Sequence, residues 1–351
     1  MADTPAGRYG IEIRNLSKIF GPNAAAMVPL VEQGITKAEL NERHAHVLGL
    51  RNIDISMPAG GIQVIMGLSG SGKSTLIRHI NRLIDPTAGE ILVGGEDVVK
   101  MSPAELREFR RHKTAMVFQK FALLPHRSVL ENTVYGLEVQ GLSREKQVEA
   151  AMRWIERVGL SGYESHYPNQ LSGGMQQRVG LARALTNDAP ILLMDEAFSA
   201  LDPLIRTDMQ TVLLDIQKEI RKTIVFITHD LDEALRLGDR IAILRDGEVV
   251  QQGTSQDIVL RPADDYVESF VKEVNRGRVV QVEAVMTPLE PGAAPGGTTV
   301  AAGVTIEEAI RTIVTGEDTD IAVIDKGGAV LGTVNLRQLA AALVTAEGPA
   351  Q

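Results

Sequence analysis

The sequence predicts an α/β fold with a buried parallel sheet, and three observations carry the prediction. The stretches "APILLMDE" (189–196) and "TIVFITH" (223–229) are continuous apolar runs, as in strands that helices cover on both faces. A third apolar strand, "GIQVIM" (61–66), leads into the glycine-rich stretch "GLSGSGKST" (67–75) and then into a helical pattern. A strand, a glycine-rich turn and a helix in this order are typical of a phosphate-binding α/β protein.

The other elements follow in chain order. Residues 10–20 alternate like a half-buried strand, and a helix-forming stretch over 36–50 opens with Thr36 and Glu39 as a capping box. Further expected elements are a strand at 53–57, a helix over 73–84 ended by Asp85-Pro86, a strand at 114–119, mostly helix over 128–187 and a hairpin turning at Asp246-Gly247. A Pro/Gly-rich loop over 287–299 precedes a small βαβ-like pattern over 305–343.

Composition narrows the class of protein. The chain has 351 residues, a net charge of −9 and no cysteine, which excludes disulfides and thiolate metal sites. An acidic chain without a basic block predicts no nucleic-acid partner. The first ten residues lack a secretory pattern, and no apolar run approaches the roughly 18 residues of a membrane span. We therefore expect an intracellular chain whose membrane role, if any, comes through a partner.

The glycine-rich stretch matches G-x-x-x-x-G-K-[ST] and predicts a nucleotide site. Its backbone N–H groups and the following helix N-terminus would face phosphates, Lys73 would reach the β- and γ-phosphates, and Ser74 would offer its hydroxyl to Mg²⁺. The candidate residues of this loop are Gly67, Ser69, Gly70, Ser71, Gly72, Lys73, Ser74 and Thr75.

Two adjacent acids end the strand at 189–196. Because side chains alternate along a strand, Asp195 and Glu196 should face different ways and do different work. We expect Asp195 to help hold Mg²⁺ and Glu196 to act on the attacking water as a general base. A further helix N-terminus, Ser172-Gly173-Gly174 in "LSGGMQQR", is suited to a phosphate, although Ser172 alone would be an ordinary helix cap.

These motifs, with Gln119 after the strand at 114–119, "SALD" (199–202) and His229, together resemble the nucleotide-binding subunits of ATP-binding cassette (ABC) transporters over about residues 10–270. The resemblance implies a P-loop NTPase fold of RecA-like core, antiparallel β subdomain and helical subdomain. It also implies a homodimer with two ATP molecules at the interface, each held by Lys73 and Glu196 of one chain and by Ser172 to Gly174 of the other.

The resemblance assigns further roles. His229 would orient the γ-phosphate and water, Gln119 would join the metal site to the membrane partner, and Asp202 would lead toward the dimer partner. Phe20 stands where the family stacks an aromatic ring on adenine, although a core Phe is the alternative. The segment 121–133 would dock the permease, with some of its apolar residues in the core.

Within the family, the phrases "MVFQKFALLPHRSVLENT" and "LLMDEAFSALDPLIR" and an insertion at 22–48 resemble the ATPases of glycine betaine/proline betaine importers. This implies a quaternary amine or betaine as the imported solute, transmembrane permease subunits, an extracytoplasmic binding protein and a peripheral place on the cytoplasmic face of the membrane. An importer of another small solute and a soluble, non-transport ABC ATPase are the alternatives.

The expected domains are 1–275, with the insertion at 22–48 and a helical subdomain at 120–187, and a single CBS-like unit at 280–346. This unit has Asn335 and Gln338 where nucleotide-binding relatives carry Ser/Thr and Asp, so we expect a degenerate unit that mainly supports a dimer. A regulatory nucleotide sensor is the alternative. His44 and His46 in the insertion are the one histidine pair at metal-ligand spacing, and we expect them to be solvated.

Overall fold

The computed structural model describes residues 9–199, 201–289, 297–316 and 318–343, and the chain divides into two compact units, 1–252 and 253–351. The division falls earlier in the chain than the expected boundary at 275–280. Helices α10 (Ser255–Leu260) and α11 (Asp265–Val271) therefore belong to the second unit. Three of the predictions fall partly outside the described residues. These are the absence of a secretory pattern, which concerns 1–8, the loop at 287–299, of which 290–296 are not described, and "SALD", of which residue 200 is not described.

A six-stranded sheet forms the centre of the first unit, in the order β10-β9-β3-β8-β7-β6. All pairs among β3, β6, β7, β8 and β9 that are in contact run parallel, and every residue of β3, β7 and β8 is buried, as the apolar runs predicted. Asp246 (φ 53°) and Gly247 (φ 88°) turn the predicted hairpin. The strands are β3 (Ile62–Met66), β6 (Thr114–Val117), β7 (Ile191–Asp195), β8 (Thr223–Thr228), β9 (Arg240–Arg245) and β10 (Glu248–Gly253).

A second sheet is antiparallel, in the order β2-β1-β4-β5, and only part of it was predicted. Strands β4 and β5 were not predicted, although Gly94-Gly95 between them is a turn signal. One hydrophobic core joins both sheets through helix α3 (Lys73–Ile80), whose Leu76, Ile77 and Ile80 have no exposed surface. The strands are β1 (Ile11–Phe20), β2 (Val47–Met57), β4 (Ala88–Val93) and β5 (Glu96–Asp97).

Helix α3 (Lys73–Ile80) ends four residues before the predicted end at Ile84. Asn81 leaves the helical conformation and Arg82 adopts a left-handed φ of 51°, which no α-helix continues. The next helix, α4 (Pro103–His112), was not predicted, yet Ser102 and Glu105 form a capping box of the type that identifies a helix start.

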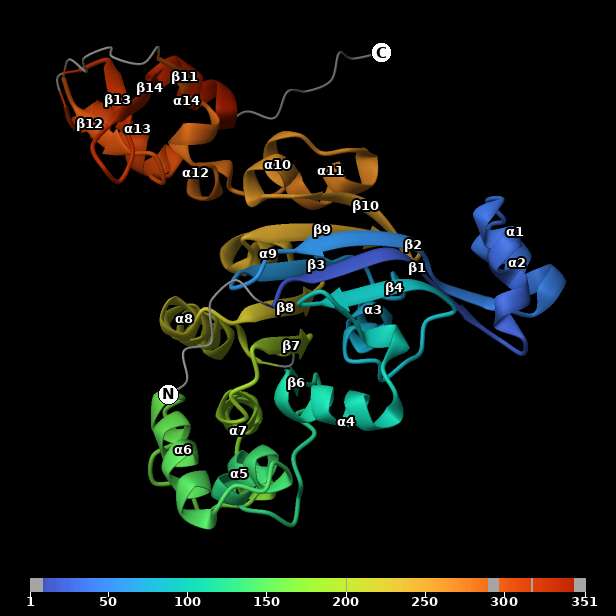
Figure 1. The fold of residues 1–351 in the computed structure, drawn as a ribbon. Helices are drawn as coiled ribbons and strands as arrows, with labels where there is room; N and C mark the ends of the chain where they lie inside the picture. The colour runs from blue at the N-terminus through green and yellow to red at the C-terminus, as the bar shows by residue number, and fades with distance from the viewer. Residues whose placement is uncertain (1–8, 200, 290–296, 317, 344–351) are drawn as a thin grey trace. The chain divides into compact units, whose positions relative to one another are not determined.

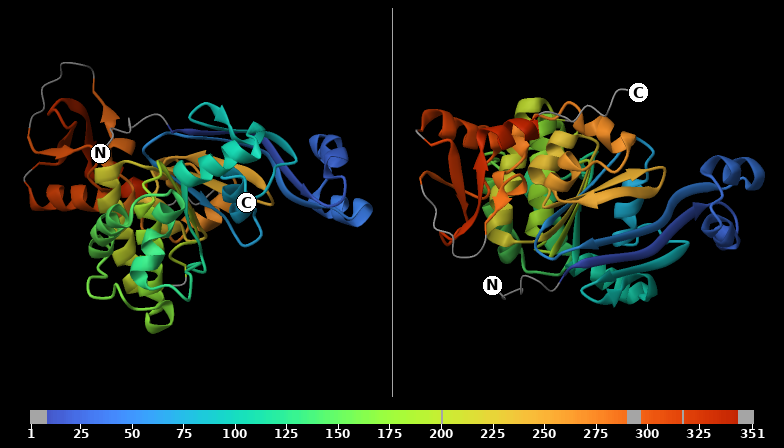
Figure 2. Two further views of the ribbon diagram at one scale, coloured as in Figure 1. Left: turned by 60° about the horizontal axis from the view of Figure 1, so that its bottom comes forward. Right: turned by 90° about the horizontal axis from the view of Figure 1, so that it is seen from above.

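The insertion forms a small layer of its own at the end of β1 and β2 (Figures 1 and 2). It contains a 3-10 turn (Ala24–Met27), α1 (Val28–Glu32) and α2 (Lys37–His44), with the predicted capping box at Thr36 and Glu39. The helix expected over 36–50 stops at His44 because Ala45 is left-handed (φ 54°) and Val47 already pairs with β1.

A separate small core holds the insertion, formed by Ile19, Val31, Leu40 and Leu48. The expectation of solvated histidines was wrong for His46, whose exposed fraction is 6%. Its Nδ1 lies 2.6 Å from the His44 carbonyl and its Nε2 lies 2.8 Å from the Pro22 carbonyl, which ties the two ends of the insertion together.

The predicted helical span forms α5 (Val129–Val139), α6 (Arg144–Arg157) and α7 (Gly173–Thr186), which pack on one another, and α7 also contacts β6 of the sheet (Figures 1 and 2). Helices α8 (Pro203–Ile220) and α9 (Leu231–Leu237) follow β7 and β8. Short 3-10 turns span Val98–Lys100 and Pro168–Gln170. Among the described residues no helix is long and apolar enough to cross a membrane.

The second unit has a four-stranded sheet in the order β11-β14-β13-β12. Strand β12 runs parallel to β13 across α13, and β14 is antiparallel to β13. The pattern predicted over 305–343 covers α13, β13, β14 and α14, whereas β11 and β12 were not predicted because they lie at the two ends of the expected loop 287–299. Thr305 and Glu308 cap α13. The elements are α12 (Arg276–Val279), a 3-10 turn (Val282–Ala284), β11 (Thr287–Pro288), β12 (Thr299–Ala301), α13 (Ile306–Thr315), β13 (Asp320–Ile324), β14 (Val330–Asn335) and α14 (Leu336–Leu343).

Candidate functional site

The glycine-rich loop between β3 and α3 has a conformation that requires its glycines. Gly67 has a φ of 150°, and a Cβ there would lie 2.2 Å from the Leu244 carbonyl oxygen. Gly72 has a φ of 103°, and a Cβ there would lie 2.9 Å from the Gly49 carbonyl oxygen. At the crest of the loop Ser69 and Gly70 are exposed. The loop thus presents open backbone above the first turn of α3, as phosphate binding needs.

Lys73 lies beneath this loop with 4% of its surface exposed. Its Nζ donates hydrogen bonds to the carbonyls of Gly67 (2.8 Å) and Leu68 (3.0 Å) and lies 3.9 Å from Oε1 of Glu196. Burial lowers the pKa of Lys73, while the carboxylates of Glu196 and Asp195 act in the opposite direction. The ammonium is therefore held at the loop by carbonyls and has a carboxylate nearby.

Asp195, at the end of β7, faces the start of α3. Its Oδ1 accepts a hydrogen bond from the Ser74 hydroxyl at 2.8 Å, and its Oδ2 lies 3.3 Å from Nη2 of Arg78. The sequence analysis did not select Arg78, although Ser74 and Arg78 are four apart on one helix and so share a face. The carboxylate is buried, at 3% exposure, and these two partners compensate its charge.

The side chains of Glu196 and Asp195 point in different directions, as predicted, but the alternation of side chains along a strand is not the cause. Strand β7 ends at Asp195, and Glu196 has a left-handed φ of 46°. This turn brings Oε2 of Glu196 within 2.9 Å of Nε2 of Gln119, which donates to it, and within 3.7 Å of Nδ1 of His229. A non-glycine residue in this region is strained, and strain of this kind concentrates at functional sites.

The structure therefore brings together six predicted residues at the C-terminal ends of the four strands β3, β6, β7 and β8. Glu196 is the shared neighbour of Lys73, Gln119 and His229, and Asp195 joins Ser74. His229 follows β8 and its side chain is 56% exposed, so a ligand can reach it. In this arrangement Gln119 contacts the carboxylate of Glu196 rather than the Ser74–Asp195 pair.

The second predicted phosphate-binding end is built as a helix start. Ser172 caps α7, its hydroxyl accepting from the Met175 N–H at 3.3 Å, and both Ser172 and Gly173 are exposed. Gly174 is buried against Ile205 in the first turn of α8, where an added Cβ would lie 3.0 Å from Cγ2 of Ile205. Asp202 caps α8 by accepting from the Ile205 N–H at 3.1 Å. Close packing of α7 on α8 thus places these candidates.

Phe20 is not a core residue, so the alternative to a ring that stacks on adenine, a buried core Phe, is wrong. Its exposed fraction is 40%, and Nζ of Lys18 lies 5.0 Å from the centre of its ring. A Cβ on Gly49 would lie 2.7 Å from Cε2 of the ring, so the ring lies on the backbone of the neighbouring strand. The exposed part of the ring is a surface on which a base could stack.

The residues present fit a nucleotide with a magnesium ion. The Ser71 hydroxyl is buried and has no hydrogen-bond partner among the described residues, so the loop has a polar group to offer phosphate oxygens. In the part of the chain that the structure describes, no three His, Cys, Asp or Glu side chains are grouped to hold a metal. Mg²⁺ needs no such group, because it is bound through one or two protein oxygens together with substrate phosphates, and Ser74 and Asp195 supply such oxygens.

Comparison with known proteins gives a consistent result. The family model described as "ABC transporter" matches residues 50–199. The chain is 54% identical over 280 residues to the glycine betaine transport ATP-binding protein OpuAA of Bacillus subtilis, covering 80% of this chain and 67% of OpuAA. It is 47% identical over 346 residues to the glycine betaine/proline betaine transport system ATP-binding protein ProV of Escherichia coli, covering 96% and 84%.

Among solved structures, the dimeric ATP-binding cassette MJ0796, in a post-hydrolysis state bound to ADP and Pi, is similar. It is 32% identical with a TM-score of 0.60, and the match covers 70% of this chain and 98% of that one. The shared region therefore has the fold of an ATP-binding cassette.

Proposed function

The chain belongs to the family of ABC transporter ATP-binding subunits, and we propose that it powers import of a quaternary amine or betaine of the glycine betaine, proline betaine, choline or carnitine class. The family binds and hydrolyses ATP. The observation that carries the proposal is the intact group of Lys73, Gln119, Glu196 and His229, on a chain 47% identical to ProV over nearly its whole length.

For hydrolysis we assign each residue by its place. Lys73 and the loop N–H groups bind phosphate oxygens, and Glu196 accepts a proton from the attacking water as the water oxygen bonds to the γ-phosphorus and the bond to ADP breaks. His229 and Gln119 hold the Glu196 carboxylate from two sides. Ser74 and Asp195 would hold Mg²⁺, with Gln119 as a further candidate, and the ion would neutralise phosphate charge.

The site is completed by a second copy of the chain. Glu196 and Lys73 lie 3.9 Å apart in one group, and none of the hydrogen bonds described for that group involves the exposed Ser172 and Gly173, which begin α7. In the proposed homodimer, these N–H groups of one chain meet the nucleotide held by Lys73, Phe20 and the loop of the other. The dimeric structure of the cassette MJ0796 supports this arrangement.

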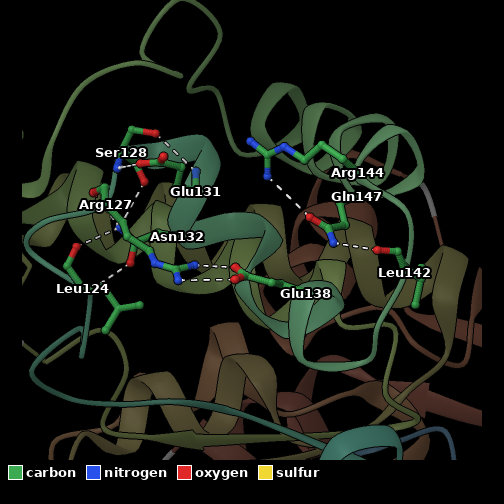
Figure 3. A network of polar contacts seen from close by, with 9 residues as sticks. All are labelled: Leu124, Arg127, Ser128, Glu131, Asn132, Glu138, Leu142, Arg144 and Gln147. Carbon is green, nitrogen blue, oxygen red and sulfur yellow. Dashed lines mark hydrogen bonds and ion pairs between the residues drawn. The ribbon is translucent and has the colours of Figure 1, made fainter.

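A surface on the helical segment fits a permease. Tyr135, Val139 and Leu142, at and after the C-terminal half of α5, are exposed at 40%, 47% and 37%. Polar contacts hold the two ends of this surface: Arg127, before α5, pairs with Glu138 of α5, and Gln147 of α6 donates to the Leu142 carbonyl between the two helices (Figure 3). The segment 121–133, expected to dock the permease, exposes Ala122, Pro125 and His126, and these three residues continue its surface. We propose that transmembrane permease subunits dock on this segment and the adjoining surface, which places the chain peripherally on the cytoplasmic face of the membrane. An extracytoplasmic binding protein would deliver the solute without touching this chain.

The unit at 280–346 we propose to be a degenerate CBS-like domain that supports the dimer. Asn335 and Gln338 bond to each other, each backbone N–H donating to the other's side-chain oxygen at 2.9 Å, and Gln338 also donates to Thr287 at 2.7 Å. Side chains engaged in this way cap α14 and are not free for a ribose or phosphate.

Uptake in a strain that lacks this chain tests the proposal. Cells expressing the chain with its permease should accumulate labelled glycine betaine or choline, and cells with Lys73→Ala should not. If the wild type restores ATPase activity in membranes but uptake of none of the quaternary amines, the solute assignment is wrong and another small solute is imported.

A further inference from the structure

The segment that follows Gln119 has an unusual backbone. Phe121 and Ala122 are consecutive residues with left-handed φ values of 54° and 48°, and neither is glycine. A non-glycine residue in this conformation is strained and persists only when its surroundings enforce it. The segment therefore needs contacts from elsewhere in the chain to hold it. Because Gln119 is only two residues earlier, the same contacts also fix the position of Gln119.

Arg183 supplies the restraint from α7. Its Nη1 donates to the Ala122 carbonyl at 2.8 Å and its Nη2 to the Phe121 carbonyl at 3.1 Å. The fork of a guanidinium suits two neighbouring acceptors better than any other side chain. The same helix approaches Phe121 elsewhere: a Cβ on Gly173 would lie 3.9 Å from Cζ of the Phe121 ring, and a Cβ on Gly180 would lie 3.7 Å from its carbonyl oxygen.

The charge of Arg183 has only carbonyl dipoles as described hydrogen-bond partners. Burial lowers the pKa of Arg183, which means that its surroundings disfavour the charge. Replacing a poorly compensated buried charge by an apolar side chain is often neutral for stability. A role in stability alone therefore gives a weak reason for an arginine at this position, whereas fixing the two carbonyls gives a specific one.

The far end of the segment is fixed as well. Asn132 on α5 accepts from the Leu124 N–H at 2.8 Å, and its Nδ2 donates to the carbonyls of Leu124 (3.1 Å), Arg127 (2.9 Å) and Ser128 (3.0 Å) (Figure 3). The chain from Gln119 to Ser128 is thus held at one end by α7 and at the other by α5.

We propose that Arg183 is a positioning residue for ATP hydrolysis, because it fixes Phe121 and Ala122 on α7 and so places Gln119 against Glu196. The same contact ties Gln119 to the helix that presents Ser172 to the other chain. A shift of α7 moves Gln119, and the state of Glu196 reaches α7 by the same route. This inference rests on the proposed roles of Gln119, Glu196 and Ser172.

The test uses the full-length chain and the variants Arg183→Met and Arg183→Lys. The matched control is Arg110→Met. Arg110 is also a partly buried arginine that bonds two consecutive carbonyls, those of Asn81 (2.9 Å) and Arg82, and Arg82 is also left-handed, at φ 51°. The control thus removes the same kind of contact from a segment that does not lead to Gln119. For each variant we measure the midpoint of thermal unfolding, the Kd of a fluorescent ATP analogue, and kcat and KM for ATP.

Arg183→Met should lower kcat about 10- to 100-fold, since misplacement of a positioned group by about 1 Å costs rates of this size. Its Kd for the ATP analogue should stay within about threefold of the wild type, because Lys73 and Phe20 are untouched. Arg183→Lys, which keeps a donor but not the fork, should fall between. Arg110→Met should keep its kcat. If Arg183→Met loses activity only in proportion to its unfolded fraction, or if Arg110→Met loses as much kcat, the inference is wrong.

Glu196→Gln in the same series separates this inference from the proposed function. If Glu196→Gln and folded Arg183→Met both keep kcat, the proposed hydrolysis site fails. If Glu196→Gln loses kcat while Arg183→Met keeps it, the site stands and only the positioning role of Arg183 falls.

Discussion

Replacing Glu196 by Gln is the most direct probe of the proposed chemistry. Gln has nearly the same shape and keeps a carbonyl oxygen that can accept from Nε2 of Gln119, which now lies 2.9 Å away. It loses the basicity that proton transfer needs. A positioned general base contributes roughly 10²- to 10⁴-fold, so kcat should fall by that factor, which corresponds to about 3–5 kcal/mol in the activation barrier.

Glu196→Gln should not weaken ATP binding, although it lowers kcat. Lys73 now has the Glu196 carboxylate at 3.9 Å, and a neutral Gln leaves that ammonium free to interact with phosphate. The Kd for ATP should therefore be unchanged or lower, and the variant should accumulate the ATP-bound dimer. Phosphate release by the purified chain gives kcat, and size-exclusion chromatography with ATP gives the dimer fraction.

Asp188→Asn is the matched control, because Asp188 stands before β7 as Glu196 stands after it. Asp188 is also left-handed (φ 51°), and its Oδ1 pairs with the buried Nζ of Lys222 at 2.8 Å. Neutralising it removes a carboxylate from a lysine without touching the site, so kcat should be unchanged. A Glu196→Gln variant with kcat within about threefold of the wild type would refute the general-base role.

Three further predictions concern single contacts. Phe20→Ala should raise the Kd for ATP about 5- to 100-fold, since base stacking on an aromatic is worth about 1–3 kcal/mol, with kcat at saturating ATP unchanged; fluorescence titration measures the Kd. Gly174→Ala should lower the free energy of unfolding by about 1–3 kcal/mol, because the new methyl lies 3.0 Å from Ile205, and Ile205→Ala should relieve it in a double-mutant cycle by urea denaturation. Burial raises the pKa of Glu233 above its ordinary 4.5, so as pH rises above 4.5 the unfolded chain loses this proton before the folded chain does, and the free energy of unfolding falls. Glu233→Gln should flatten this fall, measured by urea denaturation at a series of pH values, and an unchanged slope of free energy against pH would contradict the prediction.

Much of the site could be predicted because its residues stand at strand ends and helix starts, which local pattern specifies. The loop at 67–75 lies between a buried strand and a helix, and Asp195 and His229 end apolar runs that were predicted to be strands of a buried parallel sheet. Thr36 and Ser172 cap their helices as expected, because a cap depends on residues only three positions away.

The features that sequence reasoning missed depend on partners far along the chain. His46 is buried because the Pro22 carbonyl lies against its ring, and Glu196 turns toward Gln119 by a left-handed residue rather than by strand alternation. Arg183 bonds carbonyls some 60 positions earlier, and no periodicity signals such a contact. Helix α3 ends early for a similar reason, since Arg110 holds the carbonyls of Asn81 and Arg82.

The small core of the insertion has a consequence for engineering the chain. The connection from β1 to β2 is stabilised by a hydrophobic cluster of its own, separate from the main core. This cluster consists of Ile19, Val31, Leu40 and Leu48. Lengthening such a connection is inexpensive, since doubling a loop costs only about 0.6 kcal/mol in closure entropy. Gly34, between α1 and α2, is exposed, and a Cβ there would touch nothing within 4 Å. An affinity tag or fluorescent reporter inserted beside Gly34 should therefore leave both the fold and the ATPase intact, and would give a handle for following this subunit in a working transporter.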